Sequence, residues 1–212
     1  MNFHLDIQSP SFSTKLTYNE SLLFIGSCFA ENMALRMQTH KFNTLLNPHG
    51  VVYNPESIAT AIRHYLTNKI YTEPDLFFAN DCYHSWEHHS RFSTAHAAAC
   101  LSEINEQIAL AHIALKNAGW LFITFGSAFV YRHKQTGKRV SNCHKQPQQE
   151  FIKELLTVEE MVRTYKELIA ELQKFNNQLK IVFTVSPVRY IRDGIVENTL
   201  SKARLIEVVH QL

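Results

Sequence analysis

Three short, mainly apolar runs divide the chain, and the segments between them repeat apolar residues at helical spacing. The runs are LLFI at 22–25, LFITF at 121–125 and IVFTV at 181–185. Runs of this length are typical of strands buried on both faces of a parallel sheet. Because strands alternate with helices, the pattern predicts an α/β fold with a mainly parallel sheet covered on both faces, formed as a single domain over residues 1–212.

The remaining elements follow from caps and periodicity. We expect a short strand at 44–46 and two strands that pair around Thr136-Gly137. The irregular segment 71–96, rich in His and aromatic residues, is expected to be a functional loop. Helices are expected at 29–40, from Asn54-Pro55 onward, at 101–119, from the Thr157/Glu160 capping box onward, and from Asn198 onward.

Three of the expected strands end in small polar residues. The first is followed by Gly26-Ser27-Cys28, the second by Gly126-Ser127 and the third by Ser186-Pro187. Ligands of parallel α/β sheets bind beyond the carboxyl ends of the strands. We therefore expect these segments to converge on one edge of the sheet and to form a site there.

Composition and charge exclude several classes of function. Lys and Arg number 21 and Asp and Glu number 19, and a net charge of +2 argues against nucleic acid or an anionic membrane as a partner. No apolar run approaches the ~18 residues of a membrane span, and residues 1–16 lack the features of a signal peptide. The four cysteines form no CxxC pair, which favours reduced thiols in a cytoplasmic protein.

Ser27 is the first candidate for chemistry. A serine at a strand-to-helix turn exposes its hydroxyl to a substrate, and the amides of Cys28 and Phe29 then face the reacting oxygen. The same position also suits a helix cap, which is the structural alternative. Cys28 is the rival nucleophile, because a helix N-terminus favours the thiolate.

Histidines and one arginine complete the candidates. His88 and His89 lie in the polar loop and are read as a base, a substrate contact or structural residues. Arg189 follows the third strand and is suited either to binding an anionic or carbonyl group or to a surface ion pair. The residues that could ligate zinc are Cys82, His84, His88, His89, Cys143 and His144. Their spacing matches no standard zinc site, so we expect no metal.

Five ordered blocks resemble the GSCFA domain family. The first is Leu23–Ala30, which contains the sequence motif GSCFA itself. The others are Asn47–Pro55 (NPHGVVYNP), His88–Ser90 (HHS), Ser141–Lys145 (SNCHK) and Ser186–Arg189 (SPVR). Together they extend over most of the chain. This family is similar to the SGNH (GDSL-like) hydrolases, which are serine esterases and acylhydrolases with a three-layer α/β/α fold.

The resemblance implies roles for particular residues. Ser27 matches the nucleophile, Gly50 matches an oxyanion glycine, and Asn142 is the preferred oxyanion asparagine over Asn54, which suits a helix cap. The catalytic base is expected in an Asp-x-x-His block beyond Leu212, so the chain is expected to lack its last strand and that block. The resemblance requires no metal or organic cofactor.

The resemblance also implies a substrate class. The expected activity is cleavage of an ester or removal of an acyl group from a small molecule or a carbohydrate. The alternative is a non-catalytic domain of the same fold that binds a glycan or another ligand. A metal-dependent function of the His/Cys loop is the third reading, and the oligomeric state is left open.

Overall fold

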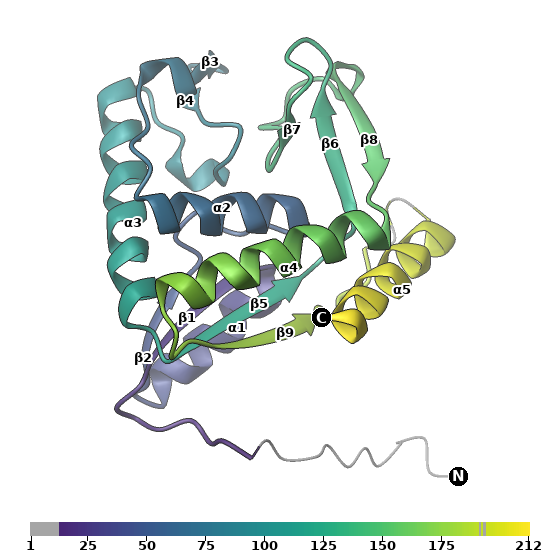
Figure 1. The fold of residues 1–212 in the computed structure, drawn as a ribbon. Coiled ribbons are helices and arrows are strands. Elements are labelled where there is room, and N and C mark those ends of the chain that lie inside the picture. The colour runs from purple at the N-terminus through teal and green to yellow at the C-terminus, as the bar shows by residue number, and fades with distance from the viewer. Residues whose placement is uncertain (1–12, 191, 193) are drawn as a thin grey trace.

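A four-stranded, fully parallel sheet forms the centre of the molecule, with strand order β2-β1-β5-β9. The computed structural model describes residues 13–190, 192 and 194–212 (Figure 1). The strands are β1 (Ser21–Gly26), β2 (Asn43–Leu46), β5 (Trp120–Phe125) and β9 (Lys180–Val185). The three apolar runs and the shorter expected strand are thus confirmed, whereas the segment used to exclude a signal peptide lies largely outside the described residues, which begin at residue 13.

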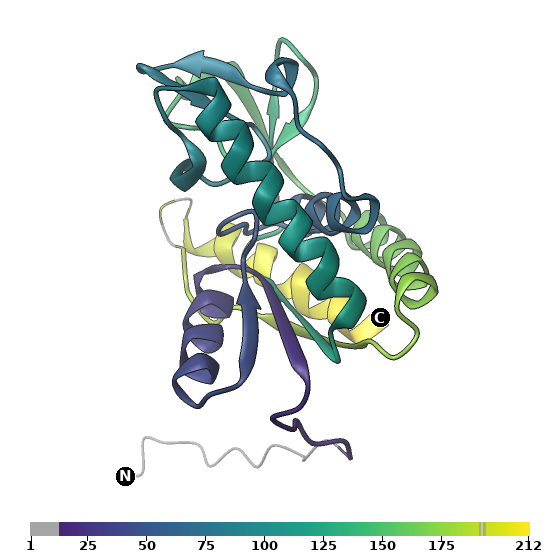
Figure 2. The same ribbon diagram turned by 90° about the vertical axis from the view of Figure 1, so that its left-hand side faces the viewer.

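Helices cover both faces of this sheet, so the expected three-layer α/β fold is confirmed. Alternate residues of β1 face opposite sides: Leu23 and Ile25 join the larger core, and Leu22 and Phe24 join a smaller one. Both sets are buried, which explains why the strand sequence is continuously apolar. Figures 1 and 2 show α1 on one side of the sheet and α3 and α4 on the other.

The helix boundaries follow from local capping. Asn54 accepts a hydrogen bond from the Ser57 amide at 2.8 Å and starts one helix, and Thr157 and Glu160 form the expected capping box of another. The helices are α1 (Cys28–Thr39), α2 (Pro55–Thr67), α3 (Ala97–Asn117), α4 (Val158–Phe175) and α5 (Ile195–Gln211). Among the described residues, none of them is both long and apolar enough to cross a membrane.

Two antiparallel units stand above α2 in the view of Figure 1. One is the hairpin of β3 (Phe77–Ala79) and β4 (Cys82–His84), and the other is the β7-β6-β8 sheet of β6 (Phe129–His133), β7 (Arg139–Val140) and β8 (Phe151–Leu155). The expected pairing around Thr136-Gly137 is confirmed. The segment 71–96 is more regular than expected, because Asn80 and Asp81 both adopt positive φ and close a tight hairpin.

The carboxyl end of β1 is packed so closely that only glycine fits there. Gly26 has φ +135°, and a Cβ atom at this position would lie 2.1 Å from the carbonyl oxygen of Thr124 in β5. This close approach brings the residues after β1 and after β5 together. The expected convergence at one edge of the sheet is confirmed here: a Cβ atom added to Gly126 would lie 3.2 Å from Cβ of Ser27.

We predict that Gly26→Ala destabilises the protein by at least about 3 kcal/mol, because the methyl group meets backbone and the φ value is strained. Gly137→Ala is the matched control. Its φ is also positive, at +68°, but no atom lies within 4 Å of the added Cβ, so the expected cost is about 1 kcal/mol. Urea denaturation measures both, and equal losses would contradict the steric account.

Candidate active site

The turn after β1 is held by hydrogen bonds to two other segments. The Gly26 amide donates to Oδ1 of Asn47 at 2.9 Å, and the Ser27 amide donates to the Thr124 carbonyl at 3.2 Å. The Gly26 carbonyl accepts from the Val52 amide at 3.1 Å. The conformation of residues 26–28 is therefore set by hydrogen bonds to β5 and to the segment after β2.

Ser27 and Cys28 occupy different environments within this turn. The Ser27 side chain is buried, with 1% of the residue exposed, and its Oγ accepts a hydrogen bond from the Phe29 amide at 3.3 Å. Ser27 is thus the N-cap of α1. Cys28 is the first residue of that helix and is half-buried. The structural alternative for Ser27 is realised, and its role as nucleophile stays a prediction.

The turn at 47–50 brings Gly50 and His89 together beside this site. Gly50 has φ +78°, and a Cβ atom there would lie 2.2 Å from Cβ of His89. The His89 amide also donates to the His49 carbonyl at 2.9 Å, and Arg91 donates to the Asn47 carbonyl at 3.0 Å. Of the expected site residues, the structure thus links Ser27, Cys28, Gly50 and His89 through the Asn47–Gly50 turn.

His89 is arranged as a hydrogen-bond donor. Its Nδ1 accepts from the Arg91 amide at 3.2 Å, so the neutral ring carries its proton on Nε2. Burial and the positive charge of Arg91 lower the pKa of His89, which favours this neutral form. In this tautomer Nε2 is able to donate a hydrogen bond to a ligand oxygen but not to accept a proton.

His88 lies in a buried cluster of rings behind the turn. Its ring stacks on His49 with centroids 4.2 Å apart, and its Nδ1 contacts Oγ of Ser85 at 2.9 Å. His49 contacts the Tyr65 hydroxyl at 2.9 Å through Nδ1. Burial lowers the pKa of His88 to about 3 and that of His49 well below its usual value. Both rings are therefore neutral at physiological pH, and His88 supports the 47–50 turn from the interior.

Asn142 and Arg189 are not hydrogen-bonded to this arrangement. Asn142 accepts from the His144 amide at 2.9 Å, and its own amide donates to the Trp86 carbonyl at 3.3 Å. Arg189 is exposed after β9. Among the described residues neither side chain forms a hydrogen bond or an ion pair with the Ser27–Cys28 turn, and their proposed roles stay predictions.

Sequence reasoning missed three residues at this edge. Asn47 opens the Asn47–Pro55 block and has no role of its own in the sequence analysis, yet its side chain accepts a hydrogen bond from the Gly26 amide. Lys202 of α5 donates to the carbonyls of Gly126 at 2.6 Å and Ser186 at 2.7 Å, and so joins the ends of β5 and β9. Tyr53 packs on Gly126. The Asn47-Pro48 pair is a turn signal that could have drawn attention to Asn47. No local sequence pattern indicates that Lys202 reaches this edge of the sheet.

Comparison with known proteins now adds to this geometry. The GSCFA family model matches residues 21–212, from the first strand of the sheet to the last helix. The chain belongs to the GSCFA family. No curated protein and no solved structure matches it.

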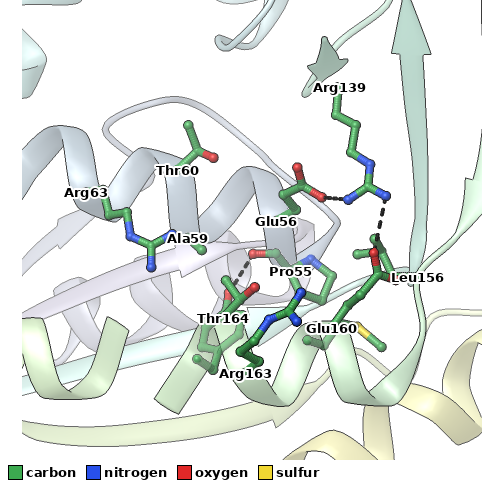
Figure 3. Close-up of a pocket in the computed structure, with 12 residues that line it drawn as sticks. Pro55, Glu56, Ala59, Thr60, Arg63, Arg139, Leu156, Glu160, Arg163 and Thr164 are labelled. Atoms are coloured by element: carbon green, nitrogen blue, oxygen red, sulfur yellow. Dashed lines mark hydrogen bonds and ion pairs between the residues drawn. The ribbon is translucent and has the colours of Figure 1, made fainter. Parts of the chain in front are cut away.

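Other sites in this GSCFA protein are less suited to chemistry. Among the described residues, no group of three or more His, Cys, Asp or Glu side chains is placed to hold a metal ion. A cavity of about 220 Å³ lies between α2 and α4 (Figure 3). Three of the charged residues that line it pair with one another, since Arg139 forms ion pairs with both Glu56 and Glu160. The cavity is therefore bounded by an ion-pair network that ties β7 to both helices.

The buried histidines predict how stability depends on pH. A folded pKa below the unfolded value of about 6.5 means that the unfolded chain binds more protons below pH 6.5, so stability is lost as pH falls. Between pH 7 and pH 5, His88 alone should remove about 2 kcal/mol. We expect His88→Gln to reduce the pH dependence of the free energy of unfolding by about this amount, measured by urea denaturation.

His210→Gln is the control, because His210 is exposed in the last helix. It should show the same pH dependence as the parent chain. A His88→Gln variant that loses as much stability as the parent between pH 7 and pH 5 would contradict the assignment of a buried neutral ring.

Proposed function

We propose that this GSCFA protein hydrolyses an ester or removes an acyl group, acting on a small molecule or a carbohydrate. The observation that carries the proposal is the Ser27–Cys28 turn at the carboxyl edge of the parallel sheet, to which Asn47 links the turn that holds Gly50 and His89. Nucleophilic acyl transfer needs a nucleophile on a rigid turn and hydrogen-bond donors for the developing oxyanion. The resemblance of the family to SGNH hydrolases supports the same chemistry.

In this proposal, hydrogen-bond donors around the turn stabilise the oxyanion. The first amides of α1 have no carbonyl one turn earlier within the helix to bond to. The Phe29 amide donates to Ser27 Oγ, so in this proposal the Cys28 amide faces the substrate carbonyl oxygen. His89 Nε2–H adds a further donor, whereas the Gly50 amide already donates to the Asn47 carbonyl at 2.7 Å and shapes the turn rather than binding the oxyanion. The proposed chemistry uses water as the only co-reactant and requires no metal or organic cofactor. The four free cysteines support a cytoplasmic location.

A non-catalytic binding domain is the second candidate. The burial of Ser27, with 1% exposed, favours it, because a buried hydroxyl that caps a helix is not presented to a substrate. This candidate predicts that a glycan or another ligand binds without turnover and that Ser27→Ala leaves binding unchanged.

Hydrolysis of p-nitrophenyl acetate tests the proposal. We predict turnover by the chain and at least a ~100-fold loss of kcat/KM in the double variant Ser27→Ala/Cys28→Ala, which removes both candidate nucleophiles. Cys82→Ala/Ser102→Ala is the matched control: it also removes one thiol and one hydroxyl, at half-buried and exposed positions away from the turn. Equal turnover by the two double variants would refute the proposed site.

A further inference from the structure

The exposure of the two adjacent candidates separates their roles. Ser27 is 1% exposed, and its Oγ is committed to the Phe29 amide as the helix cap. Cys28 begins α1 and reaches the surface as a half-buried side chain. A substrate carbonyl that approaches the carboxyl edge of the sheet therefore meets the thiol of Cys28 before the hydroxyl of Ser27.

Asn47 supplies a second, independent indication of a ligand. It is 1% exposed, and its Nδ2 is one of the buried polar atoms without a partner among the described residues. Its Oδ1 accepts from the Gly26 amide at 2.9 Å. Because the two atoms of an amide are about 2.3 Å apart, Nδ2 lies within about 5 Å of the Gly26 amide nitrogen. A buried donor left unpaired costs free energy, and a ligand oxygen that enters the turn would offset this cost by pairing with it.

One cation lies close to Cys28, and the acidic Glu31 follows in the same first turn of α1. Lys202 lies close enough for its charge to interact with the thiol: burial lowers the pKa of Lys202, and Cys28 acts in the opposite direction. Lys202 stays in place because it donates to the Gly126 and Ser186 carbonyls. A partly exposed cysteine beside a cation, at the start of a helix, is the setting in which thiols act as nucleophiles.

We propose that Cys28 is the nucleophile of this site, that Asn47 Nδ2 donates to the oxyanion, and that Ser27 serves as the cap that orients the turn. This inference rests on the proposed acyl-transfer function. The thiolate sulfur attacks the carbonyl carbon, a C–S bond forms and the ester C–O bond breaks. The thiol proton passes to solvent, and the alcohol that leaves takes a proton from water. Water then hydrolyses the thioester, releasing the carboxylic acid and restoring the thiol.

Alkylation by iodoacetamide tests the reactivity of Cys28 without any need for turnover. Cys82 and Cys143 are internal controls, because they are half-buried like Cys28. Peptide mapping of the native chain should show that Cys28 is alkylated at least ~10-fold faster than either control. A rate for Cys28 equal to or below that of Cys82 would overturn the inference.

Kinetics of single variants then separate the two adjacent groups. We expect Cys28→Ala to lose at least ~100-fold in kcat for p-nitrophenyl acetate, whereas Ser27→Gly keeps turnover within a few-fold because glycine retains most of the preference for a cap position. The reverse result would overturn the inference and leave the proposed hydrolase function standing. A parent chain without turnover would refute the proposed function, and the alkylation ratio would then decide the reactivity of Cys28 by itself.

Asn47→Gly tests the proposed oxyanion donor. Asn47 has φ +39°, which glycine tolerates, so the backbone is not strained. The variant also removes the oxygen that accepts from the Gly26 amide, and the alkylation rate of Cys28 reports whether the turn keeps its shape. We expect kcat to fall by about 100-fold while the alkylation rate of Cys28 stays within about threefold, because alkylation needs no oxyanion donor. An unchanged kcat would overturn the role of Asn47.

Discussion

The contact between Gly26 and the carbonyl of Thr124 is the constraint on which the candidate site depends. With any side chain at Gly26, β1 and β5 would be forced apart at their carboxyl ends, because a Cβ atom would lie 2.1 Å from a backbone oxygen. The contact brings the start of α1 against the residues after β5. Ser27, Cys28 and Gly126 are neighbours as a direct consequence, although about a hundred residues separate them along the chain.

The turn after β2 converts this packing contact into a polar site. Asn47 continues the ladder between β1 and β2 with its side chain, and Gly50 makes room for His89. Behind the turn, the neutral rings of His49 and His88 stack and fix its inner side. The turn is therefore supported from the interior by imidazole rings that must stay unprotonated. On its outer side, the proposed donors lie at the edge of the sheet. Stability and the geometry of the site are coupled through the same residues.

Much of this architecture could be predicted from the sequence, because its signals are local. Continuous apolar runs identified the strands of the parallel sheet, and the Asn54-Pro55 and Thr157/Glu160 patterns identified two helix starts. The β3–β4 hairpin was missed because Asn80-Asp81 lacks the glycine that marks most tight hairpins. β8 was missed because its apolar residues alternate only in part, with Ile152 exposed beside buried Phe151.

The site was harder to predict, because tertiary contacts decide it. Sequence alone places Ser27 and Cys28 at a strand-to-helix turn, but which of the two caps the helix depends on where α1 begins, a difference of one residue. The sequence offered Asn142 and Asn54 as the oxyanion asparagine, whereas the hydrogen bond from the Gly26 amide to Asn47 comes from the pairing of β1 with β2. Lys202 reaches the site from a helix near the end of the chain, which no local pattern reveals.

The central claim is that acyl chemistry takes place at the turn after β1, and trapping the acylated protein tests it most directly. The native chain is mixed briefly with p-nitrophenyl acetate, quenched in acid and digested, and the acetylated peptide is identified by mass spectrometry. The account predicts an acetyl group on Cys28, bound as a thioester that neutral hydroxylamine removes. An acetyl group found only on residues outside the Ser27–Cys28 turn would contradict it.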